Sequence, residues 1–179
     1  KTLDLQGPLI DKFGPTDPAQ FATLPRDPSG LLAMALPPAG EISALATNMT
    51  LGPHGKLNFL TNPIEEGHEY AAAGVDVSVQ AAGWLERARD AAGAAALLAN
   101  HVKTMHDDGA YTAAVPNLPG SACRKDTNKY SGNSEFTCEA ARGRYEFCLF
   151  GNTLKDAQQK AAAQYLMLGT LSVDAPITS

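Results

Sequence analysis

The residues of this chain best suited to chemistry are its three cysteines, Cys123, Cys138 and Cys148. No two of them form a Cys-x-x-Cys pair, so their spacing does not indicate a zinc site. A disulfide is the chemistry that remains. The strand-like sequences around Cys138 and Cys148 decide which pair of thiols can form it.

A two-residue turn at Arg142-Gly143 is predicted between these strands, with the glycine supplying a positive φ. Pairing outward from this turn sets Cys138 opposite Phe147. Cys138 and Cys148 then point to opposite faces of the sheet, and a bridge between them would require a register slip. Cys123 is the better partner for Cys138. Fourteen residues lie between the two, and closing a loop of that length stabilises the fold by about 3 kcal/mol in the chain-entropy model.

The two faces of this predicted hairpin differ in polarity, because residues directly opposite each other share a face. The face expected to meet the core carries Phe136, Cys138, Ala140, Tyr145, Phe147 and Leu149. The other face carries Thr137, Glu139, Arg144, Glu146, Cys148 and Phe150. It is polar except at its far end, so we expect an outer surface. Cys148 is interpreted either as a small hydrophobic residue or as a thiol covered by another element.

The four histidines, His54, His68, His101 and His106, do not form a metal-binding pattern. His101 and His106 are five residues apart, about 140° around a helix, so they do not share a face. We interpret all four histidines as surface residues. No His-Glu-x-x-His sequence is present.

Motifs for hydrolysis and phosphate binding are absent from the sequence, which has no Gly-x-Ser-x-Gly, Walker-type or Gly-x-Gly-x-x-Gly pattern. Ser121 lies beside the predicted disulfide and is interpreted as a turn residue. The acids Glu65, Glu66 and Glu69 fall at a helix start, where the macrodipole favours them. The sequence therefore predicts no catalytic residue, no cofactor and no metal site, and we expect a protein that is not an enzyme.

Hydrophobic periodicity predicts strands and helices in mixed order. Strands are expected at 41–50, 56–61, 75–87 and 111–115 and in the hairpin, and helices at 63–73, 90–109 and 153–168. This order indicates an α+β fold, with a mostly antiparallel sheet and two to three helices packed on one face. We expect one domain at 41–170, preceded by an arm or linker at 1–40 and followed by a tail at 171–179.

Seven of the twelve prolines lie within the first forty residues, which predicts an extended N-terminal arm. Its short apolar clusters, which include Phe13 and Phe21, could dock on the core or on a partner. Deletion through Leu36 is therefore expected to leave the core folded and to weaken association.

Composition restricts the classes of partner. The net charge is -5 with 18% charged residues, so no positive field would attract nucleic acid. No apolar run reaches the length of about 18 residues that a membrane span requires. A disulfide favours an oxidising compartment.

Five segments follow one another in a characteristic order: 73–76, 86–94, 115–123, 138–145 and 156–165. Together these segments resemble a family of actinobacterial, largely mycobacterial, cell-envelope lipoproteins whose domain is of unknown function. The resemblance covers roughly 30–168 and implies export, acylation at an N-terminal cysteine and a location on the outer side of the plasma membrane. No cysteine precedes Cys123, so we expect the lipid anchor to be absent from this sequence. The family supplies no catalytic residues to carry over.

These observations favour a non-enzymatic extracytoplasmic domain that binds or accompanies an envelope or membrane protein. The candidate contact residues are Phe13, Phe21, Trp84, Cys148 and Phe150. The alternative is a carrier or receptor for a small apolar ligand such as a lipid. A metal, or a buried cluster of acids and histidine in a cleft, would contradict the expectation that the fold has no reactive centre.

Overall fold

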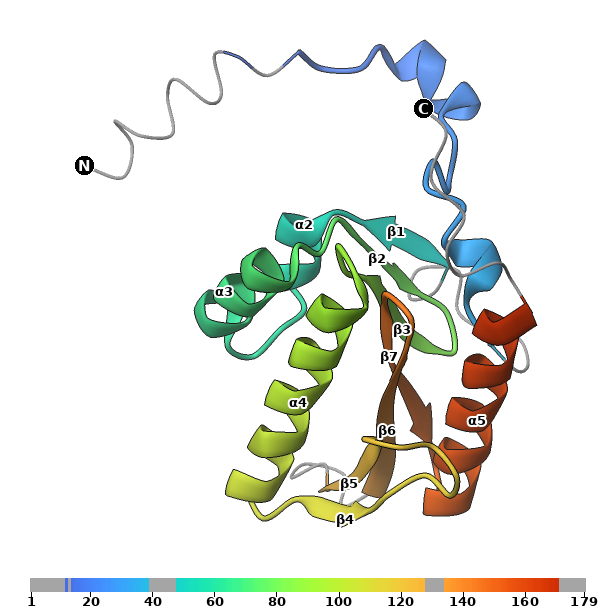
Figure 1. The fold of residues 1–179 in the computed structure, drawn as a ribbon. Coiled ribbons are helices and arrows are strands. Elements are labelled where there is room, and N and C mark those ends of the chain that lie inside the picture. The colour runs from blue at the N-terminus through green and yellow to red at the C-terminus, as the bar shows by residue number, and fades with distance from the viewer. Residues whose placement is uncertain (1–11, 13, 39–47, 128–133, 171–179) are drawn as a thin grey trace.

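A seven-stranded antiparallel sheet forms the centre of the domain, in the order β1-β2-β3-β7-β6-β5-β4. The computed structural model describes residue 12 and residues 14–38, 48–127 and 134–170. Figure 1 shows α5 on one side of the sheet and α3 and α4 on the other. The predicted α+β class and antiparallel sheet are confirmed, but helices cover both faces of the sheet rather than one.

Helices and strands occur in mixed order along the described chain. Two short 3-10 helices come first, η1 (Pro18–Thr23) and η2 (Leu32–Met34). The strands are β1 (Met49–Leu51), β2 (Val77–Gln80), β3 (Gly83–Arg87), β4 (Tyr111–Ala113), β5 (Ala122–Thr127), β6 (Ser134–Arg142) and β7 (Tyr145–Gly151). The α-helices are α2 (Pro53–Leu57), α3 (Pro63–Ala73), α4 (Ala91–Asp107) and α5 (Leu154–Thr170).

Local capping signals place the three long helices where the sequence predicts them. Proline at the first position begins α3, and Gly74 ends it in the left-handed conformation with φ 65. The Asp90 carboxylate accepts a hydrogen bond from the Gly93 amide at 2.8 Å and caps α4. Thr153 Oγ1 accepts from the Asp156 amide at 3.1 Å at the start of α5.

The β6–β7 hairpin turns one residue later than predicted, because Gly143 takes the first central position of the turn with φ 56. Arg142 therefore pairs with Tyr145, and Cys138 pairs with Leu149 rather than with Phe147. The displaced turn shifts each strand by one residue, so the pairing between them changes by two residues. Because side chains alternate with a period of two, each paired side chain keeps the face that the sequence analysis assigned to it.

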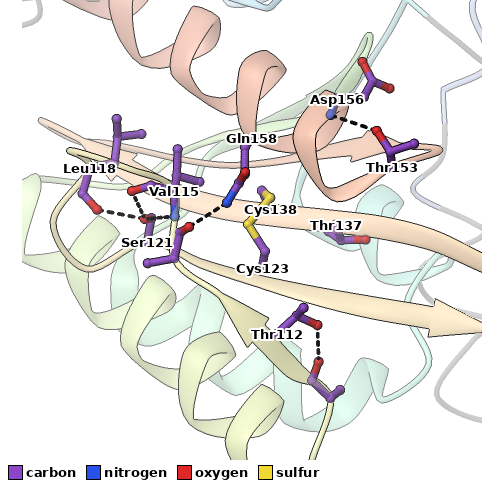
Figure 2. The surroundings of a disulfide bond; sticks show 12 residues. Thr112, Val115, Leu118, Ser121, Cys123, Thr137, Cys138, Thr153, Asp156 and Gln158 are labelled. Carbon is purple, nitrogen blue, oxygen red and sulfur yellow. Dashed lines mark hydrogen bonds between the residues drawn. A yellow bond between two sulfur atoms is a disulfide. The ribbon is translucent and has the colours of Figure 1, made fainter.

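The predicted disulfide is confirmed between Cys123 on β5 and Cys138 on β6, and the sulfur atoms are 2.08 Å apart. The two cysteines are directly opposite each other and fully buried. Figure 2 shows the bond beside Ser121, whose hydroxyl donates to the Leu118 carbonyl at 2.7 Å and accepts from the Val115 amide at 2.9 Å. Ser121 is therefore a turn-stabilising residue, as the sequence indicates.

Two segments differ from the sequence-based expectation. Residues predicted to form a strand at 56–61 instead complete α2 and the turn after it, because Pro53 begins a helix. The packed chain also begins earlier than residue 41, since Leu31 and Ala35 are buried in the core. The Gln164 side chain on α5 fixes this segment by accepting from the Leu36 amide at 2.6 Å and donating to the Met34 carbonyl at 2.9 Å. Residues 1–11, 41–47 and 171–179 lie outside the described residues.

Candidate functional site

The polar face of the β6–β7 hairpin is buried beneath α3 and α4 rather than exposed. Its carboxylates extend across neighbouring strands, because Glu86 on β3 lies directly opposite Glu146 on β7, and Ser78 on β2 lies opposite Glu86. Glu139 on β6 projects from the same face, opposite Cys148. Ser78, Glu86, Glu139 and Glu146 are all buried. The prediction of an outer surface here is wrong, because two helices cover this face.

His101 reaches the carboxylates from α4. Its Nδ1 is 3.0 Å from Glu139 Oε2 and 3.9 Å from Glu146 Oε1. The His101 side chain is 24% exposed, whereas those of Glu139 and Glu146 are 9% and 3% exposed. His101 is therefore not the surface residue that the sequence predicted. The structure contains a buried cluster of two acids and a histidine, which α4 covers.

A second ion pair lies beside this group. Lys56 Nζ on α2 is 3.4 Å from Glu86 Oε1, and both side chains are 4% exposed. The same ammonium lies over the Trp84 ring, 3.3 Å from its centroid, in a cation–π contact. The Tyr70 hydroxyl on α3 donates a hydrogen bond to Glu86. Glu86 therefore has a counter-charge and a hydrogen-bond donor of its own.

Hydrogen bonding on this face is incomplete. In the described part of the chain, four buried side-chain oxygens have no hydrogen-bond partner, and all four lie on this face of the sheet. They are Ser78 Oγ, Glu86 Oε2, Glu139 Oε2 and Glu146 Oε1. His101 lies at ion-pair distance from the last two of these oxygens, those of Glu139 and Glu146. Buried polar atoms without partners are few in native proteins and require an explanation.

Burial and charge act against each other on the ionisable groups. Burial raises the pKa of Glu146, and the carboxylates of Glu139 and Glu86 raise it further, while contact with His101 acts in the opposite direction. Burial alone would lower the pKa of His101, but its contacts with Glu139 and Glu146 outweigh this effect and raise its pKa. The folded state therefore favours a protonated imidazole among carboxylates when no other cation is present.

This arrangement can hold a proton or a small cation. One atom each from His101, Glu139 and Glu146 lies within 4.8 Å of the other two, which is a separation that one metal ion can bridge. The two carboxylates are buried and only His101 is partly exposed, so the space among them suits an ion better than an organic substrate.

The structure brings together two of the predicted contact residues, since Trp84 and Cys148 are directly opposite each other on β3 and β7. Trp84 is 9% exposed and is covered by Lys56 and by Phe59, whose ring centroid is 5.8 Å away. Burial and the nearby Glu139 raise the pKa of the Cys148 thiol. Both residues therefore belong to the margin of the buried polar cluster.

The remaining predicted contact residues lie apart from this cluster. Phe21 is 58% exposed on η1, none of whose residues is buried. Phe150 is partly buried near the end of β7. Phe13 lies outside the described residues.

Sequence reasoning missed His101 because it placed the buried stripe of α4 incorrectly. The apolar spacing of this helix predicts a buried stripe of Ala91, Ala95, Leu98, Val102 and Met105. Leu98 and Met105 are buried as predicted, but Ala91 and Ala95 are exposed, and Leu97, which the stripe omits, is buried. His101 lies four residues from Leu97 and from Met105, so it points to the sheet. The four-residue spacing of His101 from Leu97 and from Met105 was the signal available in the sequence. In an alanine-rich helix several other stripes have the same spacing, so the sequence does not single this one out.

One known family matches this chain across the folded region. Its description is "Domain of unknown function (DUF7373) C-terminal", and the match covers residues 31–170. The chain belongs to the DUF7373 C-terminal family. The match begins at Leu31, the first residue of the buried core, so the family corresponds to the packed domain of Figure 1. No curated protein and no solved structure gives a significant match to the chain.

Proposed function

We propose that this DUF7373 domain is a non-enzymatic binding domain of an actinobacterial, largely mycobacterial, cell-envelope lipoprotein. In this proposal it lies on the outer side of the plasma membrane and accompanies an envelope or membrane protein. The buried disulfide between Cys123 and Cys138 supports an oxidising compartment. Among the residues that the structure describes, none of the helices combines the length and hydropathy that crossing a membrane requires.

The observation that carries the binding proposal is the exposed apolar surface of the N-terminal segment. Phe21 is 58% exposed and Leu24 is 52% exposed. Figure 1 shows the segment around η1 extending away from the packed domain, and residues 14–26 are all exposed. The segment has local order of its own, because the Asp17 carboxylate accepts a hydrogen bond from the Ala19 amide at 2.9 Å and caps η1. A preformed turn that presents an aromatic side chain is suited to anchor in a pocket of another protein.

The buried polar cluster is compatible with a binding domain. The carboxyl groups of Glu139 and Glu146 are covered by α4, and only the partly exposed His101 reaches toward solvent. A general acid or base must come within hydrogen-bond reach of a substrate atom, and these buried carboxylates would first have to be uncovered.

The test is capture of partners from native membranes of an actinobacterium by crosslinking to the full chain. We expect Phe21→Ser to abolish recovery of a specific membrane protein, while the neighbouring exposed control Ala22→Ser retains it. A chain that begins at Asp27 should also lose the partner and keep its thermal stability. The cut belongs before Asp27 rather than at Leu36, because the Asp27 carboxylate accepts hydrogen bonds from the Leu32 amide at 2.8 Å and from the Thr50 hydroxyl at 3.5 Å. Leu31 and Ala35 are also part of the core.

The proposal fails if Phe21→Ser and the shortened chain recover the same proteins as the unchanged chain. Native mass spectrometry of the purified chain supplies a separate measurement. A retained lipid mass without any protein partner would favour the carrier alternative and would count against a protein-binding domain.

A further inference from the structure

We propose that His101, Glu139 and Glu146 form a binding site for one divalent transition-metal ion of the first row, with Zn²⁺ as the probe. The three residues come from α4, β6 and β7. Such an ion would connect the helix to the sheet on the face opposite to the disulfide.

The positions of the three side chains match a small coordination sphere. At metal–ligand distances of about 2.0–2.1 Å, two ligands of a tetrahedral site are about 3.3 Å apart. The distances from His101 Nδ1 to Glu139 Oε2 and to Glu146 Oε1 are 3.0 and 3.9 Å, which bracket that value. All three ligand atoms lie within 4.8 Å of one another, so small side-chain rotations would complete the site.

The hydrogen-bonding state of the carboxylates points independently to a ligand. Glu139 Oε2 and Glu146 Oε1 are buried and have no hydrogen-bond partner among the described residues. These are the two oxygens that face His101. The Glu146 side chain is only 3% exposed. A buried carboxylate oxygen that solvent does not reach requires a proton, a donor or a cation. A protonated His101 is the cation at ion-pair distance when no metal is bound, and one metal ion that takes the place of its proton would satisfy both oxygens.

The charges around the site also favour a cation. Glu86 acts electrostatically on Glu146, and Glu66 interacts with His101, Lys56 and Glu86. Lys56 is committed to Glu86 and to the face of Trp84. The carboxylates of this face therefore outnumber the cationic side chains that contact them.

The ligand set indicates the class of ion. One imidazole nitrogen and two carboxylate oxygens suit Zn²⁺ and its first-row neighbours, whereas Mg²⁺ and Ca²⁺ prefer oxygen ligands alone. Three protein ligands leave a position for water, and the partial exposure of His101 places that position toward solvent.

The experiment is a calorimetric titration of the full chain with ZnSO₄ after EDTA treatment and dialysis. Mass spectrometry measures the bound zinc. Tetrahedral Co²⁺ absorption provides a second readout. The site variants are Glu146→Gln and His101→Ala. Each has a matched control. Glu135→Gln changes an exposed glutamate on the same strand as Glu139, and His106→Ala changes an exposed histidine on the same helix as His101.

We expect the unchanged chain to bind one Zn²⁺ per molecule and to melt at a higher temperature when it is loaded. Glu146→Gln and His101→Ala should lose more than about 100-fold in affinity, which exceeds the usual effect of altering a residue outside the ligand set. Glu135→Gln and His106→Ala should bind as the unchanged chain does. Glu146→Gln removes a buried charge while keeping the side-chain shape, so its circular dichroism spectrum should remain native.

Three results would overturn the site. The first is the absence of stoichiometric Zn²⁺ binding by the unchanged chain. The second is equal affinity in a folded Glu146→Gln variant. The third is loss of binding in His106→Ala alone, which would place the ion on the outer face of α4. Binding of Ca²⁺ or Mg²⁺ in place of Zn²⁺ would contradict the assigned class of ion.

Discussion

Replacing Lys56 by methionine should destabilise the domain strongly, because it removes the counter-charge of a buried carboxylate. Methionine keeps the apolar stem of the lysine and deletes its ammonium, which is 3.4 Å from Glu86 and 3.3 Å from the centroid of the Trp84 ring. Breaking a buried ion pair by removing one partner costs about 3–5 kcal/mol. A desolvated cation–π contact accounts for about 2 kcal/mol of such a loss.

We therefore expect Lys56→Met to lower the free energy of unfolding by about 3–5 kcal/mol at pH 7. The variant loses both contacts of the ammonium at once, and Glu86 keeps only the hydrogen bond from the Tyr70 hydroxyl.

The assay is urea unfolding at pH 7, monitored by far-ultraviolet circular dichroism. Adding Glu86→Gln to Lys56→Met should restore part of the stability, since the charge that lacked a partner is then absent while the contact with Trp84 remains lost. The double-mutant cycle isolates the coupling between the two side chains. Lys103→Met is the matched control, because Lys103 pairs with Asp107 on the exposed side of α4. That variant should behave like the unchanged chain.

A loss of less than about 1 kcal/mol in Lys56→Met at pH 7 would refute this reasoning. A double variant Lys56→Met, Glu86→Gln that is no more stable than Lys56→Met alone would also refute it, because the penalty would then not come from the charge of Glu86. Either result would mean that α2 does not cover the polar face as the structure describes.

Three further predictions concern the disulfide and two groups beside the buried polar cluster. Replacing Cys123 and Cys138 by serine should lower the free energy of unfolding by about 3 kcal/mol in denaturant titrations. Cys148 should resist alkylation at pH 8 until the protein unfolds, because burial raises the pKa of its thiol. Burial and Glu86 raise the pKa of Tyr70, so stability from its neutral phenol is complete below about pH 10 and declines above it. Tyr70→Phe should therefore lose stability less steeply than the unchanged chain in urea titrations above about pH 10.

Local rules predicted much of the fold from the sequence, because they act within a few residues. The proline at the start of α3 and Gly74 at its end give the helix its observed bounds, and Asp90 does the same for the start of α4. The two faces of the hairpin were assigned correctly although the turn is displaced. Gly143 occupies the first central position instead of the second, and shifting both strands by one residue preserves the alternation.

The buried polar cluster could not be predicted because its members come from segments far apart in the chain. Alternation identified Glu139 and Glu146 as a polar face, but a polar face that meets water and one that meets a helix have the same pattern. Only the packing of α4 decides between them, and the many alanines of α4 leave its buried stripe ambiguous. The disulfide was predictable because the local β6–β7 turn places Cys138 and Cys148 on opposite faces of the sheet, which leaves Cys123 as the partner of Cys138.

The central claim is that the buried face of the sheet holds one cation between α4 and the hairpin. X-ray diffraction at the zinc absorption edge, from crystals of the full chain soaked in ZnSO₄, tests it most directly. We expect one anomalous peak about 2.0–2.2 Å from His101 Nδ1, Glu139 Oε2 and Glu146 Oε1. A well-ordered cluster without an anomalous peak, or a peak only at His106, would contradict the claim.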